Sequence, residues 1–226
     1  MKYEPVRRAS PRVYGLARRV FQLLVGTLLR AEVSGVENVP LEGSFLAVVN
    51  HLGLADPTLI MSYFPRQMTV FAADKWRRVF PIRQIVETVG VIWVARGEAD
   101  LSAIRQAVGT LKDGWPIGMA PEGTRSRTRT LQAGKVGAAY LADRAGVPIL
   151  PVGIWGTERL TENLRRLRRT PVHMRIGPPF RLPDGGRADS QALKTYTEEI
   201  MCRIAALLPP EYRGVYADHP GVSPAA

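Results

Sequence analysis

The pattern of apolar and polar positions beyond residue 43 predicts strands and helices in regular succession. Short aliphatic runs predict strands over residues 44–50, 68–73, 90–95, 116–120, 147–154 and 172–176. Apolar residues spaced three and four apart predict helices over residues 57–64, 98–112, 134–145 and 189–208. This alternation predicts an α/β fold in which a mostly parallel, mixed sheet is flanked by helices on both faces.

Three parts of the chain depart from this alternation. Residues 74–89 are predicted to form short helical turns. The strand over residues 147–154 contains Pro148 and Pro151, and proline cannot donate to a strand ladder. We therefore expect an edge or irregular strand there, although its apolar residues also suit a core strand. The proline-rich tail, residues 209–226, is predicted to be extended.

The N-terminal segment has the pattern of an amphipathic helix over residues 13–29, with arginines opposite and beside its apolar face. Its apolar face carries Val13, Leu16, Val20, Leu23, Leu24, Thr27 and Leu28. Such a helix either lies in the interface of an anionic membrane or packs on the protein's own core, and the positive flanks favour the membrane. The chain is therefore divided into a membrane-binding segment, residues 1–30, a folded domain, residues 31–208, and the tail.

Composition adds an anionic partner to this picture. The 226 residues suit one domain, and the formal net charge of +11 with a pI of about 10.4 would attract acidic lipids or phosphorylated substrates. Most of the surplus is arginine, which makes bidentate contacts with phosphate. Nucleic acid is not the expected partner, because no nucleic-acid-binding motif appears and aromatic residues do not alternate with the arginines.

Cysteine and histidine are scarce. The single Cys202 cannot form an internal disulfide, which fits a reducing compartment, and helical spacing predicts a core position for it. Three histidines and one cysteine show no zinc-site spacing, so no metal or other cofactor is expected. No run approaches the ~18 apolar residues of a membrane-spanning helix, and no signal peptide is expected.

The segment 50–56, Asn-His-Leu-Gly-Leu-Ala-Asp, follows a predicted buried strand and precedes a predicted helix. Ligands usually bind at such strand-to-helix loops in open α/β sheets. His51 can accept a proton near neutral pH, and a nearby carboxylate such as Asp56 can fix its tautomer. The alternative is that His51 is an ordinary loop residue and Asp56 caps the helix, and one carboxylate can serve both roles.

Two further loops carry arginines at strand ends. Arg96 follows the strand 90–95 and precedes a helix start, which suits phosphate binding as well as a surface ion pair. The loop 121–127, Pro-Glu-Gly-Thr-Arg-Ser-Arg, has a glycine that permits close backbone approach and arginines that can hold phosphate. Its Glu122 can accept a substrate hydroxyl or orient an arginine, whereas the alternative is a solvated basic turn.

Four segments in this order resemble the four motifs of the glycerolipid acyltransferases, most closely those of the lysophosphatidic acid acyltransferases. They are Asn-His-x4-Asp at 50–56, Val-Ala-Arg-Gly at 94–97, Pro-Glu-Gly-Thr-Arg-Ser at 121–126 and Val-Pro-Ile-Leu-Pro-Val at 147–152. The resemblance covers residues from about 31 to 180. One departure is Ala95, where the family often has an acidic residue before the arginine.

The resemblance implies a role for each motif. His51 is the general base and Asp56 orients it. The acceptor and its phosphate are bound by the set Arg96, Glu122, Gly123, Thr124 and Arg125. Pro148 and Pro151 contribute to the groove for the acyl chain or the acceptor. The co-substrate is an acyl thioester on coenzyme A or acyl carrier protein, and the product is phosphatidic acid.

The resemblance also implies an enzyme bound to anionic lipids at the cytoplasmic face of a membrane. Two alternatives remain at this stage. The same chemistry can act on another lysophospholipid, an amine-containing lipid or a glycolipid. A peripheral anionic-lipid-binding protein would use the basic helix alone, but it would leave His51 and Asp56 without a purpose.

Overall fold

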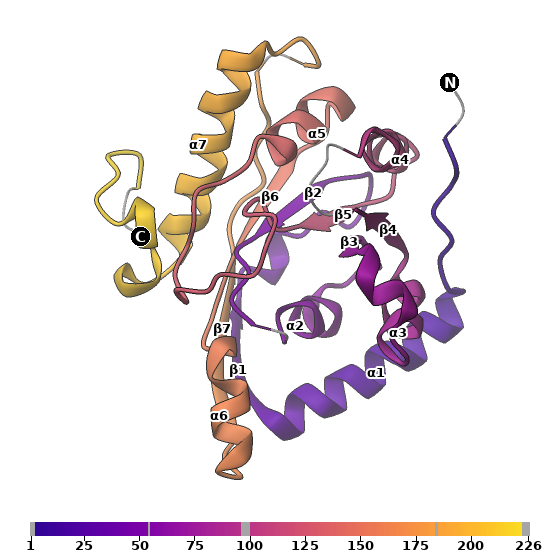
Figure 1. The fold of residues 1–226 in the computed structure, drawn as a ribbon, viewed down its shortest axis with the longest axis vertical. Helices are drawn as coiled ribbons and strands as arrows, with labels where there is room; N and C mark the ends of the chain where they lie inside the picture. The colour runs from indigo at the N-terminus through magenta and orange to yellow at the C-terminus, as the bar shows by residue number, and fades with distance from the viewer. Residues whose placement is uncertain (1–2, 54, 96–99, 184, 223–226) are drawn as a thin grey trace.

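A computed structural model describes residues 3–53, 55–95, 100–183 and 185–222 of the chain. A seven-stranded sheet forms its centre, in the order β1-β7-β6-β2-β5-β3-β4 (Figure 1). The strands are β1 Leu29–Ser34, β2 Leu46–Val49, β3 Thr69–Ala73, β4 Val91–Val94, β5 Ile117–Met119, β6 Ile149–Trp155 and β7 Thr170–Ile176. Strands β2 to β6 run parallel, and the pair β1 and β7 runs in the opposite direction.

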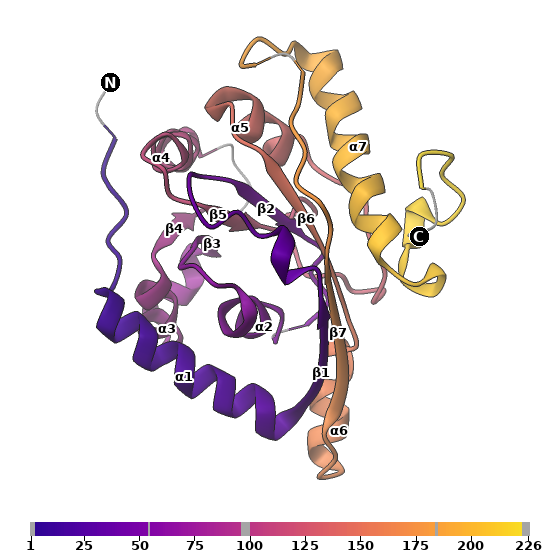
Figure 2. The ribbon, with the colours of Figure 1, turned by 180° about the vertical axis from the view of Figure 1, so that it is seen from behind.

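Helices cover both faces of the sheet, as predicted. They are α1 Pro11–Leu28, α2 Asp56–Tyr63, α3 Ile82–Val89, α4 Leu101–Lys112, α5 Gly137–Ala145, α6 Leu160–Arg165 and α7 Ser190–Leu207. One buried core contains residues of α4, α5 and α7, and a second contains residues of α1 and α2. The view from behind separates these two layers (Figure 2). The predicted α/β fold with a mostly parallel, mixed sheet is confirmed.

Two elements escaped the sequence prediction. Strand β1 reads Leu-Arg-Ala-Glu-Val-Ser and buries only alternate positions, and it follows α1 without an intervening turn. Helix α6 has six residues, too few for a helical period to show. The predicted short turns at 74–89 are a 3-10 helix, Asp74–Arg78, followed by the two-turn α3.

The prediction of an edge position for the proline-containing strand is wrong. Strand β6 lies inside the sheet, between β2 and β7. Its ladder with β7 ends where Val152 pairs with Ile176, and the next contact is a hydrogen bond from the Gly177 amide to the Pro151 carbonyl at 2.9 Å. β7 leaves the ladder at the position where Pro151 has no amide to donate. An interior strand can therefore contain Pro151.

The N-terminal residues pack against the rest of the described chain. Val6 is buried in one core and Val25 of α1 in the other. The opposite side of α1 carries exposed apolar side chains, Val13, Leu16, Val20, Leu23 and Leu24, which we call the apolar stripe of α1. No helix in the described ranges has the length and apolar content to cross a membrane. The assignment of residues 1–30 as a membrane-binding segment stays a prediction.

The tail differs from the expected extended chain over residues 209–222. It forms two 3-10 turns, Pro210–Tyr212 and Gly214–Tyr216. Their aromatic side chains Tyr212 and Tyr216 are buried in the same core as α7. The Tyr212 hydroxyl donates to the buried Glu158, and burial with this carboxylate raises the pKa of Tyr212 to about 12. Apolar area on two tyrosines outweighs the local effect of the prolines here.

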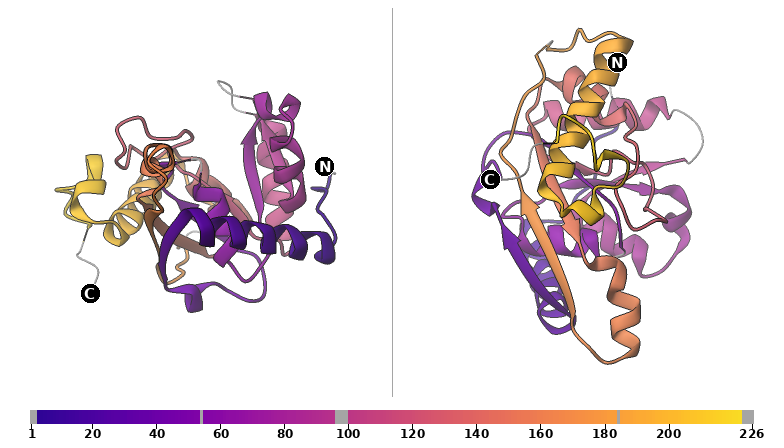
Figure 3. Two further views of the ribbon diagram at one scale, coloured as in Figure 1. Left: turned by 90° about the horizontal axis from the view of Figure 1, so that it is seen from below. Right: turned by 90° about the vertical axis from the view of Figure 1, so that its left-hand side faces the viewer.

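One edge of the sheet collects the loops that carry the motifs. The loops after β2, β3, β4, β5 and β6 all leave the carboxyl ends of parallel strands. Because β7 and β1 run in the opposite direction, the end of α6 and the end of α1 lead into the sheet at the same edge. Figure 3 shows this side from below, with α1 and the end of α6 in front of the sheet. The predicted site therefore lies where ligands bind in open α/β sheets.

Candidate active site

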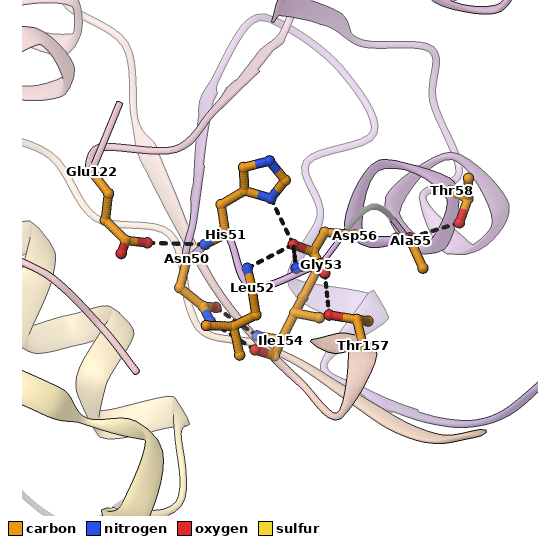
Figure 4. Close-up of polar contacts among 10 residues, drawn as sticks. All are labelled: Asn50, His51, Leu52, Gly53, Ala55, Asp56, Thr58, Glu122, Ile154 and Thr157. Carbon is orange, nitrogen blue, oxygen red and sulfur yellow. Dashed lines mark hydrogen bonds and ion pairs between the residues drawn. The ribbon is translucent and has the colours of Figure 1, made fainter. Parts of the chain in front are cut away.

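The imidazole of His51 and the carboxylate of Asp56 form a hydrogen-bonded pair. Nδ1 of His51 lies 2.7 Å from Oδ2 of Asp56 (Figure 4). The His51 side chain is 30% exposed, whereas that of Asp56 is 2% exposed. An ionised carboxylate only accepts hydrogen bonds, so the proton at this contact belongs to Nδ1. Nε2 is therefore the ring nitrogen with a free lone pair. It belongs to His51, the more exposed residue of the pair.

Asp56 is buried but fully hydrogen-bonded. Its Oδ2 also accepts the backbone amides of Leu52 and Gly53, both at 2.9 Å. Its Oδ1 accepts the hydroxyl of Thr157 at 2.5 Å. Four donors offset the desolvation of the buried carboxylate and fix its orientation. The imidazole therefore meets a carboxylate that cannot rotate without breaking several bonds.

The alternative that Asp56 caps its own helix does not hold. Asp56 is the first residue of α2, and Ala55 occupies the cap position without a side-chain bond. The Asp56 carboxylate turns back to the preceding loop and takes the amides there. Pro57 fits the start of α2 because the first helical positions need no amide donor.

Thr157 is a site residue that the sequence analysis missed. It is 2% exposed, directly follows Gly156 at the end of β6, and joins Asp56 across a separation of 101 residues. Gly53 makes this approach possible, because a Cβ there would lie 2.7 Å from the Thr157 hydroxyl. The available signal was position alone: a hydroxyl residue at the carboxyl end of a parallel strand.

Asn50 fixes the base of the same loop. Its Nδ2 donates to the Ile154 carbonyl and its Oδ1 accepts the Ile154 amide, each at 2.7 Å. The side chain thus pairs with β6 as a strand residue would, just after β2 ends. Fully paired and completely buried, Asn50 sets the point at which the chain turns toward His51.

The backbone of His51 is held by the loop after β5. Its amide donates to Oε1 of Glu122 at 2.9 Å, and its carbonyl accepts the amide of Ser126 at 2.8 Å. Oε2 of Glu122 accepts the amide of Gln132 at 3.0 Å. Because both backbone groups of His51 bond to one loop, the third motif positions the base of the first motif.

Glu122 is 2% exposed, and burial raises the pKa of its carboxyl above the usual range, against the opposing effect of the two backbone amides. The structure places its oxygens on the backbone of the two loops, whereas its predicted contact with substrate stays a prediction. Gly123 follows in the left-handed conformation, at a φ of 71°, and the side chain of Lys135 packs over it. A glycine is required by that backbone geometry.

The residues that face solvent beyond Glu122 suit a charged ligand. Thr124 and Arg125 are exposed next to Ser126, whose amide bonds to His51. The structure thus brings Arg125 to the same edge as His51. The assigned Arg96 lies outside the described residues.

The predicted groove prolines lie just before β6 and within it. Pro148 precedes Ile149, which pairs with Leu46 at the edge where the parallel strands begin. Pro151 is buried within β6 and pairs with Val48. Pro151 is therefore enclosed within the sheet, and Pro148 lies at the edge opposite to His51. Their assignment to the groove for the acyl chain or the acceptor stays a prediction.

The comparisons with known proteins agree with this fold and show the family. A family model described as Acyltransferase matches residues 30–155, which is more than half of the chain. The chain belongs to this acyltransferase family. The match begins in β1 and ends at Trp155, so it includes the His51–Asp56 pair and the loop of Glu122.

Two curated relatives carry the same name. The 1-acyl-sn-glycerol-3-phosphate acyltransferase of Borreliella burgdorferi is 29% identical over 55% of this chain and 51% of its own. The protein of that name from Escherichia coli is 40% identical over 38% of this chain and 34% of its own. The chain thus aligns with about half and about a third of these relatives.

A solved structure is similar over a longer range. The 1-acyl-sn-glycerophosphate (LPA) acyltransferase PlsC from Thermotoga maritima superposes with a TM-score of 0.63 at 27% identity. The superposition covers 84% of this chain and 75% of that one. The similarity therefore includes most of the sheet and its helices, well beyond the motif loops.

Proposed function

We propose that this protein transfers a fatty acyl group from an acyl thioester to the free hydroxyl of lysophosphatidic acid, which yields phosphatidic acid. The observation that carries the proposal is the partly exposed His51, bonded through Nδ1 to the buried Asp56 at the carboxyl edge of the sheet. The names of the relatives and of the structural neighbour support the same acceptor.

The geometry supports direct transfer with His51 as general base. Nε2 takes the proton of the acceptor hydroxyl as that oxygen attacks the thioester carbonyl. Asp56 stabilises the imidazolium through Nδ1. The tetrahedral intermediate then expels the thiolate, which takes the proton back from Nε2. A thioester is already activated, so no acyl-enzyme is needed and positioning of two substrates provides much of the rate.

The acceptor phosphate is assigned to the basic loop after β5. Arg125 is exposed, and it follows Thr124 and precedes Ser126, the residue bonded to the backbone of His51. A guanidinium there can hold a phosphate so that the glycerol hydroxyl reaches Nε2. The net charge of +11 would also draw the phosphates of coenzyme A or the acidic surface of acyl carrier protein.

The substrates are lipids, and the enzyme is assigned to the cytoplasmic face of a membrane, where it binds peripherally. The apolar stripe of α1 supports this assignment, because five apolar side chains between 46% and 71% exposed lie on one helix. A helix with such a stripe and positive flanks favours the interface of an anionic bilayer.

The acceptor is tested by thiol release from palmitoyl-coenzyme A in detergent. Lysophosphatidic acid, lysophosphatidylcholine and glycerol 3-phosphate are compared as acceptors, and palmitoyl-acyl carrier protein is compared as donor. We expect release with lysophosphatidic acid and little with the other two acceptors. Equal release with lysophosphatidylcholine, or release that needs no acceptor, would contradict the proposed substrate.

A further inference from the structure

The segment between β6 and β7 projects from the body of the molecule as a helical hairpin, residues 159–169, which we call the basic hairpin. It contains α6 and five arginines, Arg159, Arg165, Arg166, Arg168 and Arg169. In Figure 1 it extends below the sheet, farther than α1, at the same end of the molecule. The residue two places before it is Thr157, which holds Asp56.

The tip of the basic hairpin presents leucine to solvent. Leu167 is 95% exposed and Leu164 is 50% exposed. Leu167 is the left-handed residue after α6, with a φ of 53°, and its amide donates to the Leu164 carbonyl at 3.1 Å. This position usually carries glycine, because a side chain is unfavourable there. The sequence therefore places a large apolar side chain where the backbone geometry disfavours it and where it is not buried in a core.

Positive charge surrounds these leucines. Within the hairpin region two ion pairs form among described residues, Arg159 with Glu158 and Arg166 with Glu162. Arg165 and Arg168 belong to neither pair and are exposed. Apolar side chains at a tip ringed by guanidinium groups match the interface of an anionic bilayer, where leucine enters the acyl boundary and arginine stays with the phosphates.

The basic hairpin is bonded to the carboxyl end of α1, the helix that carries the apolar stripe. Arg169 donates to the carbonyls of Gly26 and Leu29, each at 2.7 Å, at the carboxyl end of α1. In Figure 1, α2 and α3 lie on the inner side of α1, so its other side faces the same end as the hairpin. The two elements thus lie at the same end of the molecule, with exposed apolar side chains on α1 and exposed apolar and basic side chains on the hairpin.

We propose that the basic hairpin is a second membrane-docking element, which inserts Leu167 into an anionic lipid surface beside α1. Docking at two points orients the enzyme, because the hairpin begins next to Thr157 and therefore fixes the height of the His51–Asp56 pair above the lipid. This inference deepens the proposed action on membrane lipids and rests on it. The occupant is an anionic lipid surface, because its acyl boundary takes up projecting leucine side chains while its phosphates pair with the neighbouring arginines.

The test uses the full-length chain and vesicles of phosphatidylcholine with and without phosphatidylglycerol. An environment-sensitive dye on Leu167→Cys, in a Cys202→Ala background, reports the polarity at the tip. We expect a blue shift with anionic vesicles and little change with neutral ones. Leu41→Cys is the matched control, because Leu41 is 71% exposed but precedes β2, at the opposite edge of the sheet. Its dye should not shift.

Substitutions separate docking from folding. Leu167→Gly should weaken binding to anionic vesicles about tenfold, since one leucine leaves the lipid, while the melting temperature is unchanged or higher. Arg165→Ala with Arg168→Ala should weaken binding by roughly fivefold for each charge. The matched pair Arg105→Ala with Arg187→Ala removes the same charge from exposed positions elsewhere and should have little effect.

Three outcomes would overturn the proposal. The first is an unchanged emission of the dye at position 167 on vesicles that bind the protein. The others are an unchanged vesicle affinity in Leu167→Gly and a blue shift of the dye produced by acyl carrier protein alone. Failure of the proposed function is seen separately. Thiol release from a short-chain acyl-coenzyme A, with a short-chain, water-soluble lysophosphatidic acid as acceptor and without vesicles, depends on the site and not on docking. The hairpin variants should keep that release at the wild-type rate.

Discussion

The start of α2 and the loop after β5 each bury a carboxylate at the carboxyl edge of the sheet, and the two carboxylates have different surroundings. Asp56 and Glu122 are both 2% exposed. Asp56 accepts from an imidazole, a hydroxyl and two amides, whereas Glu122 accepts amides from two loops. Two equally buried carboxylates therefore have different roles. Asp56 bonds to the imidazole of His51, whereas Glu122 holds the backbone amide of His51.

The comparison predicts its largest effect at Asp56. Asp56→Asn removes the negative charge that fixes the Nδ1 proton of His51, so turnover should fall about 10³–10⁴-fold, as for the equivalent change in a protease triad. Steady-state thiol release measures this, with circular dichroism to show that the variant folds. A folded variant with more than a tenth of wild-type turnover would break the distinction between the two carboxylates.

At the loop after β5, Arg125 is exposed and is assigned to the acceptor phosphate, whereas the oxygens of Glu122 accept backbone amides of His51 and Gln132. Arg125→Ala should raise the KM for lysophosphatidic acid about 10–100-fold, the value of a charged hydrogen bond, and should change kcat less. Arg187→Ala is the control of equal charge in an exposed position before α7. A normal KM for Arg125→Ala would move the phosphate site to another part of the edge.

A smaller effect is expected at Thr157. Thr157→Val keeps the shape of the side chain beside Gly53 but leaves Oδ1 of Asp56 without its donor, so kcat should fall about tenfold. Thr157→Ser restores the hydroxyl and should recover most of the rate. If serine and valine behave alike, Thr157 only packs, and it does not position Asp56.

The smallest expected effect is a change in the stability of the folded protein with pH. Burial raises the pKa of Glu122 in the folded protein, so the unfolded chain releases this proton at a lower pH than the folded chain does. Stability should therefore fall as pH rises from the usual carboxyl range through the raised pKa. The melting temperature should decline by about 2–4 °C per kcal/mol lost, and Glu122→Gln should remove this component of the slope. An unchanged slope in Glu122→Gln would contradict the assignment.

The sequence pattern predicted the His51–Asp56 pair but not its contact with Thr157. The apolar run before Asn50 and the spacing of His51 and Asp56 were sufficient to place the dyad at a strand end, because both residues lie close in sequence. Thr157 lies 101 residues away in sequence, just after β6, and only the order of β2 and β6 in the sheet brings it to Asp56. Local pattern carries no information about that order.

The same limit explains the incorrect expectations. The two prolines suggested an edge strand because proline cannot donate a hydrogen bond to a neighbouring strand. The sequence pattern does not show that β7 leaves β6 at Pro151, since that depends on tertiary pairing. The tail looked extended because prolines dominate locally, whereas Tyr212 and Tyr216 find a core that other elements build. Long runs with a clear period, such as α4 and α7, were predicted well because their own side chains determine which face is buried.

The most direct test of the account measures lysophosphatidic acid-dependent thiol release from palmitoyl-coenzyme A by the wild type and His51→Ala in the same detergent. The account predicts that the variant folds, melts near the wild type, and loses about 10²–10⁴ of the acceptor-dependent rate. Acceptor-dependent release at a similar rate from folded His51→Ala would contradict the central claim that Nε2 of His51 takes the acceptor proton.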